Sequence, residues 1–351
     1  MINRLLIFLL RIMVCATLFA GDGLAANIRI SETGRVDGLH NGSIDVDTAL
    51  TSNMTDERAI VCNFYFEGVV SAGDRNKLLS IMQVWRRAHK LESPRICLNS
   101  PGGSYDEGLA IAELLMGELI GTAVEADAVC ASACALIFMA GSAPWKGQLN
   151  RFLHVSGLVA FHAPYLDPSK MAGQPLSAAD VAPSFERGLR AVNRLIKLGQ
   201  GRVAHFFDNE LLSEMLDRGP NEIFAIDTVI KAIRYRVALY GARAPRISPE
   251  TLVNACINYF YGGRLQLTPQ ELSEVKATKM KRFLQGLRAE FDVAPRGGSC
   301  TIDLVTNGDA VIRWVFHRSY PGNEGFDGPT SITLAYWYLY PPATPIATMS
   351  R

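Results

Sequence analysis

Apolar and polar positions between residues 59 and 164 follow two different periods. Short β-branched or continuously apolar runs predict strands at 59–70, 94–99, 121–129 and 157–164. Apolar residues at helical spacing lie between these runs and predict helices over 74–91, 104–120 and 130–141. Strands that alternate with helices through short connections predict an α/β fold with a mostly parallel sheet.

The start of the second helix has a clear local signal. Ser104 is followed three residues later by Glu107, which forms the sequence pattern of a capping box. The helix is therefore expected to begin at Ser104 or Tyr105. The preceding "SPGGS" reads as a turn that connects it to the strand at 94–99.

The pattern changes in the second half of the chain. Helices are predicted over 183–207 and 209–219, followed by a short strand at 222–227. Pro, Gly and Arg cluster at 240–250, where we place a domain boundary. The core domain is thus predicted over 59–240. The C-terminal domain, 241–351, reads as a small α+β unit with a helix at 268–291 and strands at 300–307, 310–317 and 331–341.

The first 26 residues resemble a secretory signal peptide. Arg4 precedes an apolar stretch, and small residues end the segment at Ala26. An uncleaved N-terminal membrane anchor is the alternative, although Arg11 interrupts the apolar run. Residues 27–58 are polar and turn-rich and are expected to run over the surface as a lead-in. The predicted location is periplasmic or secreted.

The composition of the chain limits which classes of function can be expected. The chain has 351 residues, 48% of them hydrophobic and 20% charged, as in a globular protein with a core. A net charge of +1 gives no reason to expect a nucleic-acid partner. The histidines lack a zinc-type spacing such as HExxH, and no phosphate-binding GxxxxGK[ST] occurs. We expect no metal and no cofactor.

Seven cysteines are present, and Cys15 lies in the predicted signal peptide. An exported chain can form disulfides from the others, which are Cys62, Cys97, Cys130, Cys134, Cys256 and Cys300. Cys256 and Cys300 are the only two beyond residue 240, so this pair is predicted first. The other four are either disulfide-bonded or buried free thiols.

Three short strings carry candidate chemistry. In "SPGGS", glycine leaves the backbone N–H accessible to a reacting oxygen, although a plain tight turn also explains the string. In "CASAC", Ser132 opens a helix, either as a nucleophile or as a small packing residue, and the N–H of Ala133 is then an unpaired donor. His162 ends an apolar strand, either as the base that the serine needs or in a structural role.

In their order, "NSPGGSYDEGLAIAELL", "CASACALIFMAG" and "GLVAFHAP" resemble the signature blocks of the Clp protease proteolytic-subunit family. The likeness is closest to the exported, periplasmic ClpP-like proteins, whose fold is shared with the crotonase superfamily. It covers about residues 59–240 and leaves the C-terminal domain unexplained. The resemblance implies a ClpP/crotonase-like βαβ spiral core with a small C-terminal α+β domain.

The resemblance also implies roles for individual residues. Ser132 would be the nucleophile and His162 the general base, and the N–H groups of Gly103 and Ala133 would form the oxyanion hole. The family's third triad member, an aspartate just before a short strand, has no clean match. Glu222 lies nearest that position, Asp217 is the second choice, and Asp208 is a poor third. Alternatively, each of these acids caps or solvates the helix before it and has no catalytic role.

These features predict an exported serine peptidase or hydrolase that acts on a peptide or small acyl substrate. No ATPase partner is expected, because the docking lead-in of Clp subunits is not recognisable and the bacterial periplasm lacks ATP. One alternative is a catalytically inactive ClpP-like scaffold that binds a partner. A third reading is a crotonase-type acyl-CoA enzyme. Homo-oligomerisation is expected by fold analogy alone.

Overall fold

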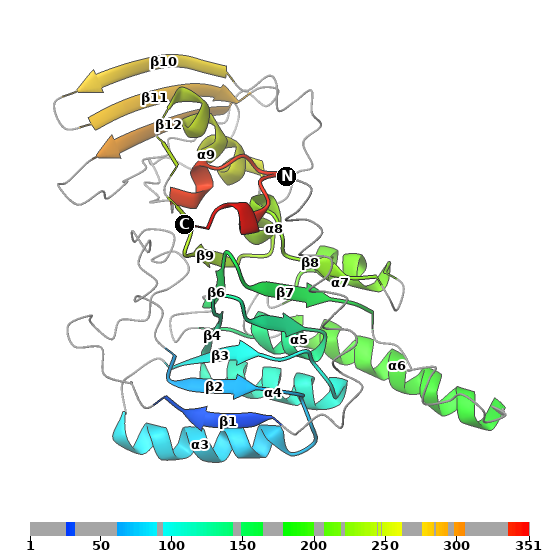
Figure 1. The fold of residues 1–351 in the computed structure, drawn as a ribbon. Coiled ribbons are helices and arrows are strands. Elements are labelled where there is room, and N and C mark those ends of the chain that lie inside the picture. The colour runs from blue at the N-terminus through cyan, green and yellow to red at the C-terminus, as the bar shows by residue number, and fades with distance from the viewer. Residues whose placement is uncertain are drawn as a thin grey trace, which may run out of the picture.

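The protein is a mixed α/β structure with one large and two small sheets (Figure 1). For strands β10–β12 and part of α6, the backbone alone is described. The computed structural model describes residues 26–31, 62–89, 94–142, 149–163, 178–199, 207–218, 222–243, 245–246, 248–261, 276–283, 286–293, 298–305 and 336–350.

The large sheet has six strands in the order β1-β2-β3-β4-β6-β9. Only the β1–β2 pair is antiparallel, so the prediction of a mostly parallel sheet is confirmed. Strand β1 was not predicted, because it is a single short edge strand within a polar segment. The strands are β1 (Asn27–Ile30), β2 (Phe64–Glu67), β3 (Arg95–Asn99), β4 (Gly121–Val124), β6 (Arg151–His154) and β9 (Ala238–Tyr240).

A second, three-stranded sheet contains β5 (Val129–Ala131), β7 (Leu158–Phe161) and β8 (Phe224–Ala225). The run predicted as one strand at 121–129 is therefore two strands, β4 and β5, in different sheets. The intervening Asp127 has a left-handed φ of 59°, which turns the chain between them. Strand β6 precedes β7 in the same way and was not predicted.

The helices of the core confirm the helical periodicity. They are α3 (Asp74–Ala88), α4 (Tyr105–Glu118) and α5 (Ala133–Met139). Ser104 is the N-cap of α4 and accepts a hydrogen bond from the Glu107 N–H at 3.4 Å. The Glu107 carboxylate accepts instead from the Arg75 N–H at 2.7 Å, so only half of the capping box forms.

Helix α5 lies at the centre of the core. Every one of its residues is buried, and it packs against strands of both the large and the β5-β7-β8 sheet. Helix α4 covers it on another side, where Gly108 meets Ala133. The first residue position of α5 is thereby fixed relative to both sheets.

Three helices follow β7: α6 (Ala178–Gly199), α7 (Asn209–Leu216) and α8 (Val229–Arg234). Helix α6 extends away from the sheets in Figure 1 and is joined to α4 by an Arg194–Glu113 ion pair of 2.7 Å. Helix α8 was not predicted. Among the described residues, none of the helices is both long and apolar enough to cross a membrane. The predicted signal peptide, except for Ala26, lies outside these residues.

The C-terminal region differs from its prediction. Helix α9 (Pro249–Tyr261) leads to an antiparallel meander of β10 (Lys276–Phe283), β11 (Gly286–Val293) and β12 (Gly298–Val305). The predicted helix at 268–291 is wrong wherever the backbone is described, because strand pairing overrides the helix propensity of its Lys, Glu and Leu residues. The predicted strand at 300–307 is confirmed as β12, whereas 310–317 lies outside the described residues.

The described residues 336–350 return to the core domain, and 336–341 do not form the strand predicted at 331–341, whose first five residues lie outside the described residues. Residues 336–350 contain the 3-10 helices η3 (Tyr336–Leu339) and η4 (Ile346–Thr348). The Ile346 N–H donates to the Asp227 carbonyl at 2.9 Å, next to α8. The buried Asn258 of α9 donates to the Tyr338 and Tyr340 carbonyls at 2.8 Å each. Residues on both sides of position 240 thus share one hydrophobic core.

Two disulfides are present, Cys62–Cys97 and Cys130–Cys134, so the free-thiol alternative for these four cysteines is wrong. Cys256 is also disulfide-bonded. The side chain of Cys300 lies outside the described residues, and the Cys256–Cys300 pair remains a prediction.

Candidate functional site

Ser132 occupies a sharp turn between β5 and α5. It is the N-cap of α5, as predicted, with φ 56° and ψ −123°. A residue other than glycine at such a φ carries a backbone strain of about 1–3 kcal/mol, and strain of this kind is concentrated at functional sites. The turn is held by the Ser132 N–H, which donates to the Ala160 carbonyl at 2.9 Å, and by the Ala135 N–H, which donates to the Ser132 carbonyl at 3.0 Å. A strained strand-to-helix turn is the setting in which serine hydrolases present their nucleophile.

The Pro-Gly-Gly segment packs directly against this turn. Gly102 has φ 102°, and a Cβ built on it would lie 2.6 Å from the Ala131 carbonyl oxygen and 2.7 Å from the Ser132 Cβ. Only glycine allows this approach. The buried Ser100 fixes the segment, since its hydroxyl accepts from the Gly102 N–H at 3.1 Å.

The two amides predicted for the oxyanion hole occupy different environments. Ala133 is buried as the first residue of α5, and its nitrogen lies 3.1 Å from the Cβ position of Gly102. Gly103 is exposed, and its own Cβ position would overlap the Val70 backbone. Neither amide donates to an acceptor elsewhere in the described chain. Both N–H groups therefore remain available to an oxygen, and Gly102 is the glycine that touches Ser132.

His162 leaves the small sheet at the same end as Ser132. Strands β5 and β7 are parallel with Ala131 opposite Ala160, and Ser132 and His162 directly follow these strands. The imidazole is partly buried, and its Nδ1 lies 2.8 Å from the Ala163 carbonyl oxygen. An Nδ1–H that donates to this carbonyl leaves the lone pair on Nε2, which is the tautomer of a general base.

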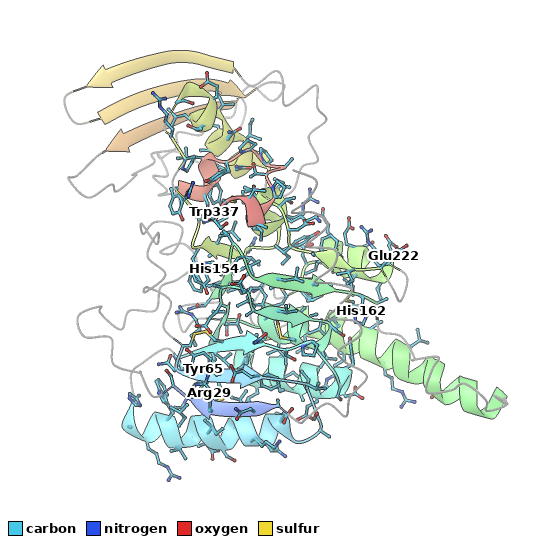
Figure 2. The ribbon with its side chains drawn as sticks, in the orientation of Figure 1. Arg29, Tyr65, His154, His162, Glu222 and Trp337 are labelled. Atoms are coloured by element: carbon cyan, nitrogen blue, oxygen red, sulfur yellow. A yellow bond between two sulfur atoms is a disulfide. The ribbon has the colours of Figure 1, made fainter. Side chains whose placement is uncertain are left out.

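Glu222 lies just before β8, the strand that pairs with the end of β7. Strand β8 is antiparallel to β7 with Phe161 opposite Phe224, and Glu222 is two residues before Phe224. Figure 2 shows Glu222 and His162 on the same side of the molecule. Glu222 is exposed.

The two other candidate acids, Asp208 and Asp217, lie at the two ends of α7. Asp208 is its N-cap and accepts from the Glu210 N–H at 2.9 Å, which is the capping alternative for this residue. Asp217 is the C-cap, and its N–H donates to the Ser213 carbonyl at 2.8 Å. Asp208 is thus used as a helix cap, and Glu222 is the candidate acid nearest in sequence to the strand that pairs with β7.

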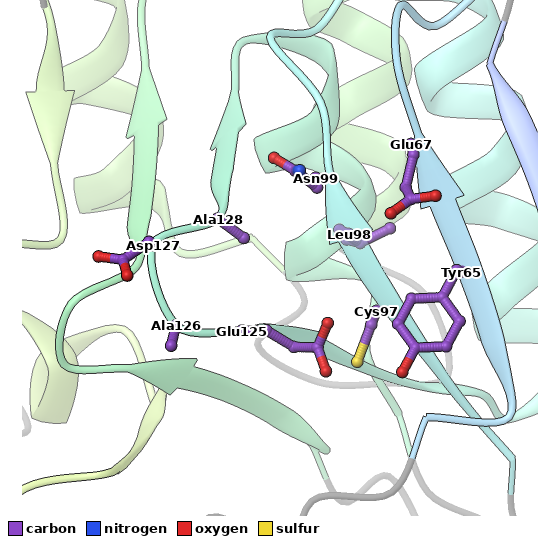
Figure 3. Close-up of a pocket in the computed structure, with 9 residues that line it drawn as sticks. All are labelled: Tyr65, Glu67, Cys97, Leu98, Asn99, Glu125, Ala126, Asp127 and Ala128. Atoms are coloured by element: carbon purple, nitrogen blue, oxygen red, sulfur yellow. The ribbon is translucent and has the colours of Figure 1, made fainter. Parts of the chain in front are cut away.

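A pocket of about 140 Å³ lies at the carboxyl ends of β2, β3 and β4, outside the residues predicted for the site (Figure 3). Its acidic side chains are Glu67, Glu125 and Asp127, which were not singled out in the sequence. Each of these three acids ends or follows a strand of a parallel sheet. Ligands often bind at the carboxyl ends of such strands, so the predicted strand ends could have pointed to these acids.

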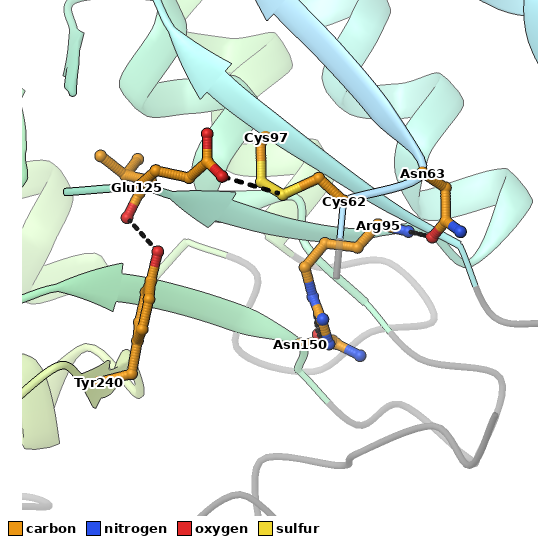
Figure 4. Close-up of a disulfide and its surroundings, with 8 residues drawn as sticks. Cys62, Asn63, Arg95, Cys97, Glu125, Asn150 and Tyr240 are labelled. Atoms are coloured by element: carbon orange, nitrogen blue, oxygen red, sulfur yellow. Dashed lines mark hydrogen bonds between the residues drawn. A yellow bond between two sulfur atoms is a disulfide. The ribbon is translucent and has the colours of Figure 1, made fainter. Parts of the chain in front are cut away.

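Glu125 connects this pocket to a disulfide (Figure 4). Its Oε1 lies 3.7 Å from the Cys62 Sγ. Partial burial, and secondarily the nearby Glu67 carboxylate, raise the pKa of Glu125. Within the described chain, Cys62, Cys97 and Glu125 are the one compact group of metal-ligand side chains. The two sulfurs are bonded to each other and so are not thiolate ligands.

No protein-family model and no curated protein sequence matches this chain.

Proposed function

We propose that this protein is an exported serine hydrolase of ClpP-like architecture that acts on peptide or small acyl substrates without ATP. The observation that carries the proposal is the strained, left-handed Ser132 at the strand-to-helix turn, with His162 leaving the adjacent strand. Of the four described residues other than glycine at positive φ, Ser132 is the one that stands between a strand and the helix that follows it.

The repeated topology supports the ClpP-like part of the proposal. In the units β4-β5-α5 and β6-β7-α6, one strand enters the large sheet, a short turn follows, and the next strand enters the small sheet before a helix. Such units of two strands and one helix support the proposed spiral core, where the sequence predicted one strand per helix. The carboxyl ends of β5 and β7 bring Ser132 and His162 to the same edge.

In the proposed mechanism, Ser132 Oγ attacks the substrate carbonyl while His162 Nε2 takes its proton. The amides of Gly103 and Ala133 donate to the oxyanion that forms. When this intermediate collapses, the bond to the leaving group breaks and His162 gives that group the proton. Water, deprotonated by His162, then attacks the acyl-enzyme, the acid product leaves, and the proton returns to Ser132 Oγ. The Ala163 carbonyl orients the imidazole, and the exposed Glu222 stabilises its positive charge from the solvent side.

A catalytically inactive scaffold is the second candidate. It is favoured by one observation, which is that the Nδ1 contact of His162 is to a backbone carbonyl. In this reading the core domain would serve partner binding, and Ser132 would be a structural turn residue.

A fluorophosphonate probe, which bonds covalently to activated serines, distinguishes the two functions. We expect the purified wild type to be labelled and Ser132→Ala and His162→Ala to be unlabelled. Glu222→Gln is expected to slow labelling by no more than about tenfold, because an exposed carboxylate acts through solvent. Ser80→Ala and His89→Ala, both on or next to α3, are matched controls that should label as the wild type does. A folded wild-type protein that stays unlabelled contradicts the hydrolase and favours the scaffold.

A further inference from the structure

The Cys130–Cys134 disulfide encloses Ser132. Cys130 is in β5 and Cys134 is the second residue of α5, so the bond joins the strand to the helix across the turn. Both cysteines are fully buried. Ser132 is the central residue of the short ring that the bond closes.

The span of the bond restricts the conformation of the ring. Its cysteines are four positions apart, with a Cα–Cα distance of 5.1 Å. Four residues of extended chain would span roughly 13–14 Å, so the bond is compatible only with a sharply folded turn. Positive φ brings the Cβ of a serine into steric conflict with the backbone, so the conformation of Ser132 needs support from the surrounding structure.

We propose that Cys130 and Cys134 are positioning residues whose disulfide holds Ser132 in its left-handed conformation and keeps the Ala133 amide beside it. This inference rests on the proposed hydrolase function and adds a requirement to it, which is that full activity needs the bond. The hydrogen bond from Ser132 to Ala160 and the contact with Gly102 hold the middle of the turn but do not join the strand to the helix.

The second disulfide provides a matched control. Cys62–Cys97 joins residues 35 positions apart and lies in the large sheet beside Glu125. Its cysteines are also buried, at 4% and 2% exposure, so Cys62→Ala/Cys97→Ala removes an equivalent bond that does not enclose Ser132.

The test is the time course of fluorophosphonate labelling. In Cys130→Ala/Cys134→Ala, the rate constant should fall by about tenfold to a hundredfold, the size of effect expected when a reacting group moves by about 1 Å. The final labelled fraction and the pH midpoint of labelling should be unchanged, because His162 is intact. The rate constant for labelling of Cys62→Ala/Cys97→Ala should stay within about twofold of the wild-type value, because this disulfide is remote from the Ser132 turn and distant sites affect each other little.

A merely structural bond gives a different result, in which fewer chains are labelled but at the wild-type rate constant. That result, or a wild-type time course in Cys130→Ala/Cys134→Ala, overturns the positioning role. If the wild type itself is not labelled, the proposed hydrolase fails separately. In that case, hydrogen exchange of the Ser132 and Ala135 amides tests whether the disulfide holds the turn. Exchange of these amides should be at least about tenfold faster in Cys130→Ala/Cys134→Ala than in the wild type. Equal exchange overturns the inference.

Discussion

Glu125 shows how one carboxyl in the acidic pocket is influenced by its surroundings. It is partly buried, and both this burial and the Glu67 carboxylate disfavour its charged form and raise its pKa. A carboxyl whose pKa is higher in the folded protein than in the unfolded chain favours the folded state when it is protonated. This contribution is complete below the unfolded pKa of about 4.3 and is lost as the pH rises through the folded pKa.

Glu125→Gln should therefore stabilise the protein at pH 7 and not at pH 4. The expected gain in the free energy of unfolding is below about 1 kcal/mol, because solvent screens a half-exposed carboxylate. Urea denaturation at the two pH values measures it, and the exposed Glu222→Gln is the control. A larger gain at pH 4 than at pH 7 would contradict the assignment of the pKa shift.

At the scale of elements, the crossing of α4 and α5 determines where the Ser132 turn lies. A Cβ on Gly108 of α4 would lie 3.0 Å from both the Cβ and the carbonyl oxygen of Ala133. The two helices are thus as close as their backbones permit. Gly117, on the same helix, is exposed and has no atom within 4 Å of its Cβ position.

We expect Gly108→Ala and Gly117→Ala to have opposite effects. Gly117→Ala should raise the free energy of unfolding by up to about 1 kcal/mol through helix propensity. Gly108→Ala gains the same propensity but forces α5 away, and overpacking of this kind costs about 1–3 kcal/mol. Chemical denaturation measures both, and fluorophosphonate labelling should be slower in Gly108→Ala alone. Equal stabilisation by the two substitutions would show that the helix crossing has no effect on the turn.

At the scale of the whole molecule, the C-terminal residues pack against much earlier parts of the chain and close the structure. Residues 336–350 return to the core domain, where Thr228 pairs with Pro345 and Ala242 pairs with Ser350. Trp337, in η3, is 1% exposed and packs against Tyr338 with ring centroids 4.6 Å apart. The C-terminal residues therefore share one hydrophobic core with α8, β9 and α9.

Trp337→Ala tests this closure. Removal of a buried tryptophan should lower the free energy of unfolding by about 3–5 kcal/mol, in a single transition seen by every probe. Leu189→Ala on α6, where the side chain is 56% exposed, should change it by less than about 0.5 kcal/mol. Calorimetry together with far-UV circular dichroism makes the comparison. Two separate transitions in the wild type would mean that the C-terminal residues fold independently.

Local signals in the sequence predicted the elements around the candidate site. Helices α3 and α4 have apolar residues at helical spacing, and Ser104 caps α4 as its pattern indicates. The same reasoning predicted that Ser132 begins a helix. These predictions succeeded because propensity, capping and periodicity act within one or two turns of chain.

The failures have a common physical origin. Strand β6 was missed because it begins with Arg151, which is fully buried and donates from Nη1 to the Tyr235 carbonyl at 3.1 Å. Burial lowers the pKa of Arg151 to about 9. Strands β10 and β11 have helix-forming residues but pair with each other as a hairpin, and β11 also pairs with β12. In both cases, long-range contacts outweighed local preference.

The sequence by itself determined the α/β class, the helix that follows Ser132, and the glycines and the histidine that make up the candidate site. The tertiary structure alone decided that Gly102 touches Ser132, that β8 pairs antiparallel with β7, and that Cys130 bonds to Cys134. This division reflects how far apart in the sequence the interacting residues lie. Helix caps and turns depend on neighbouring residues, whereas strand register, disulfide partners and backbone approach depend on how distant segments pack.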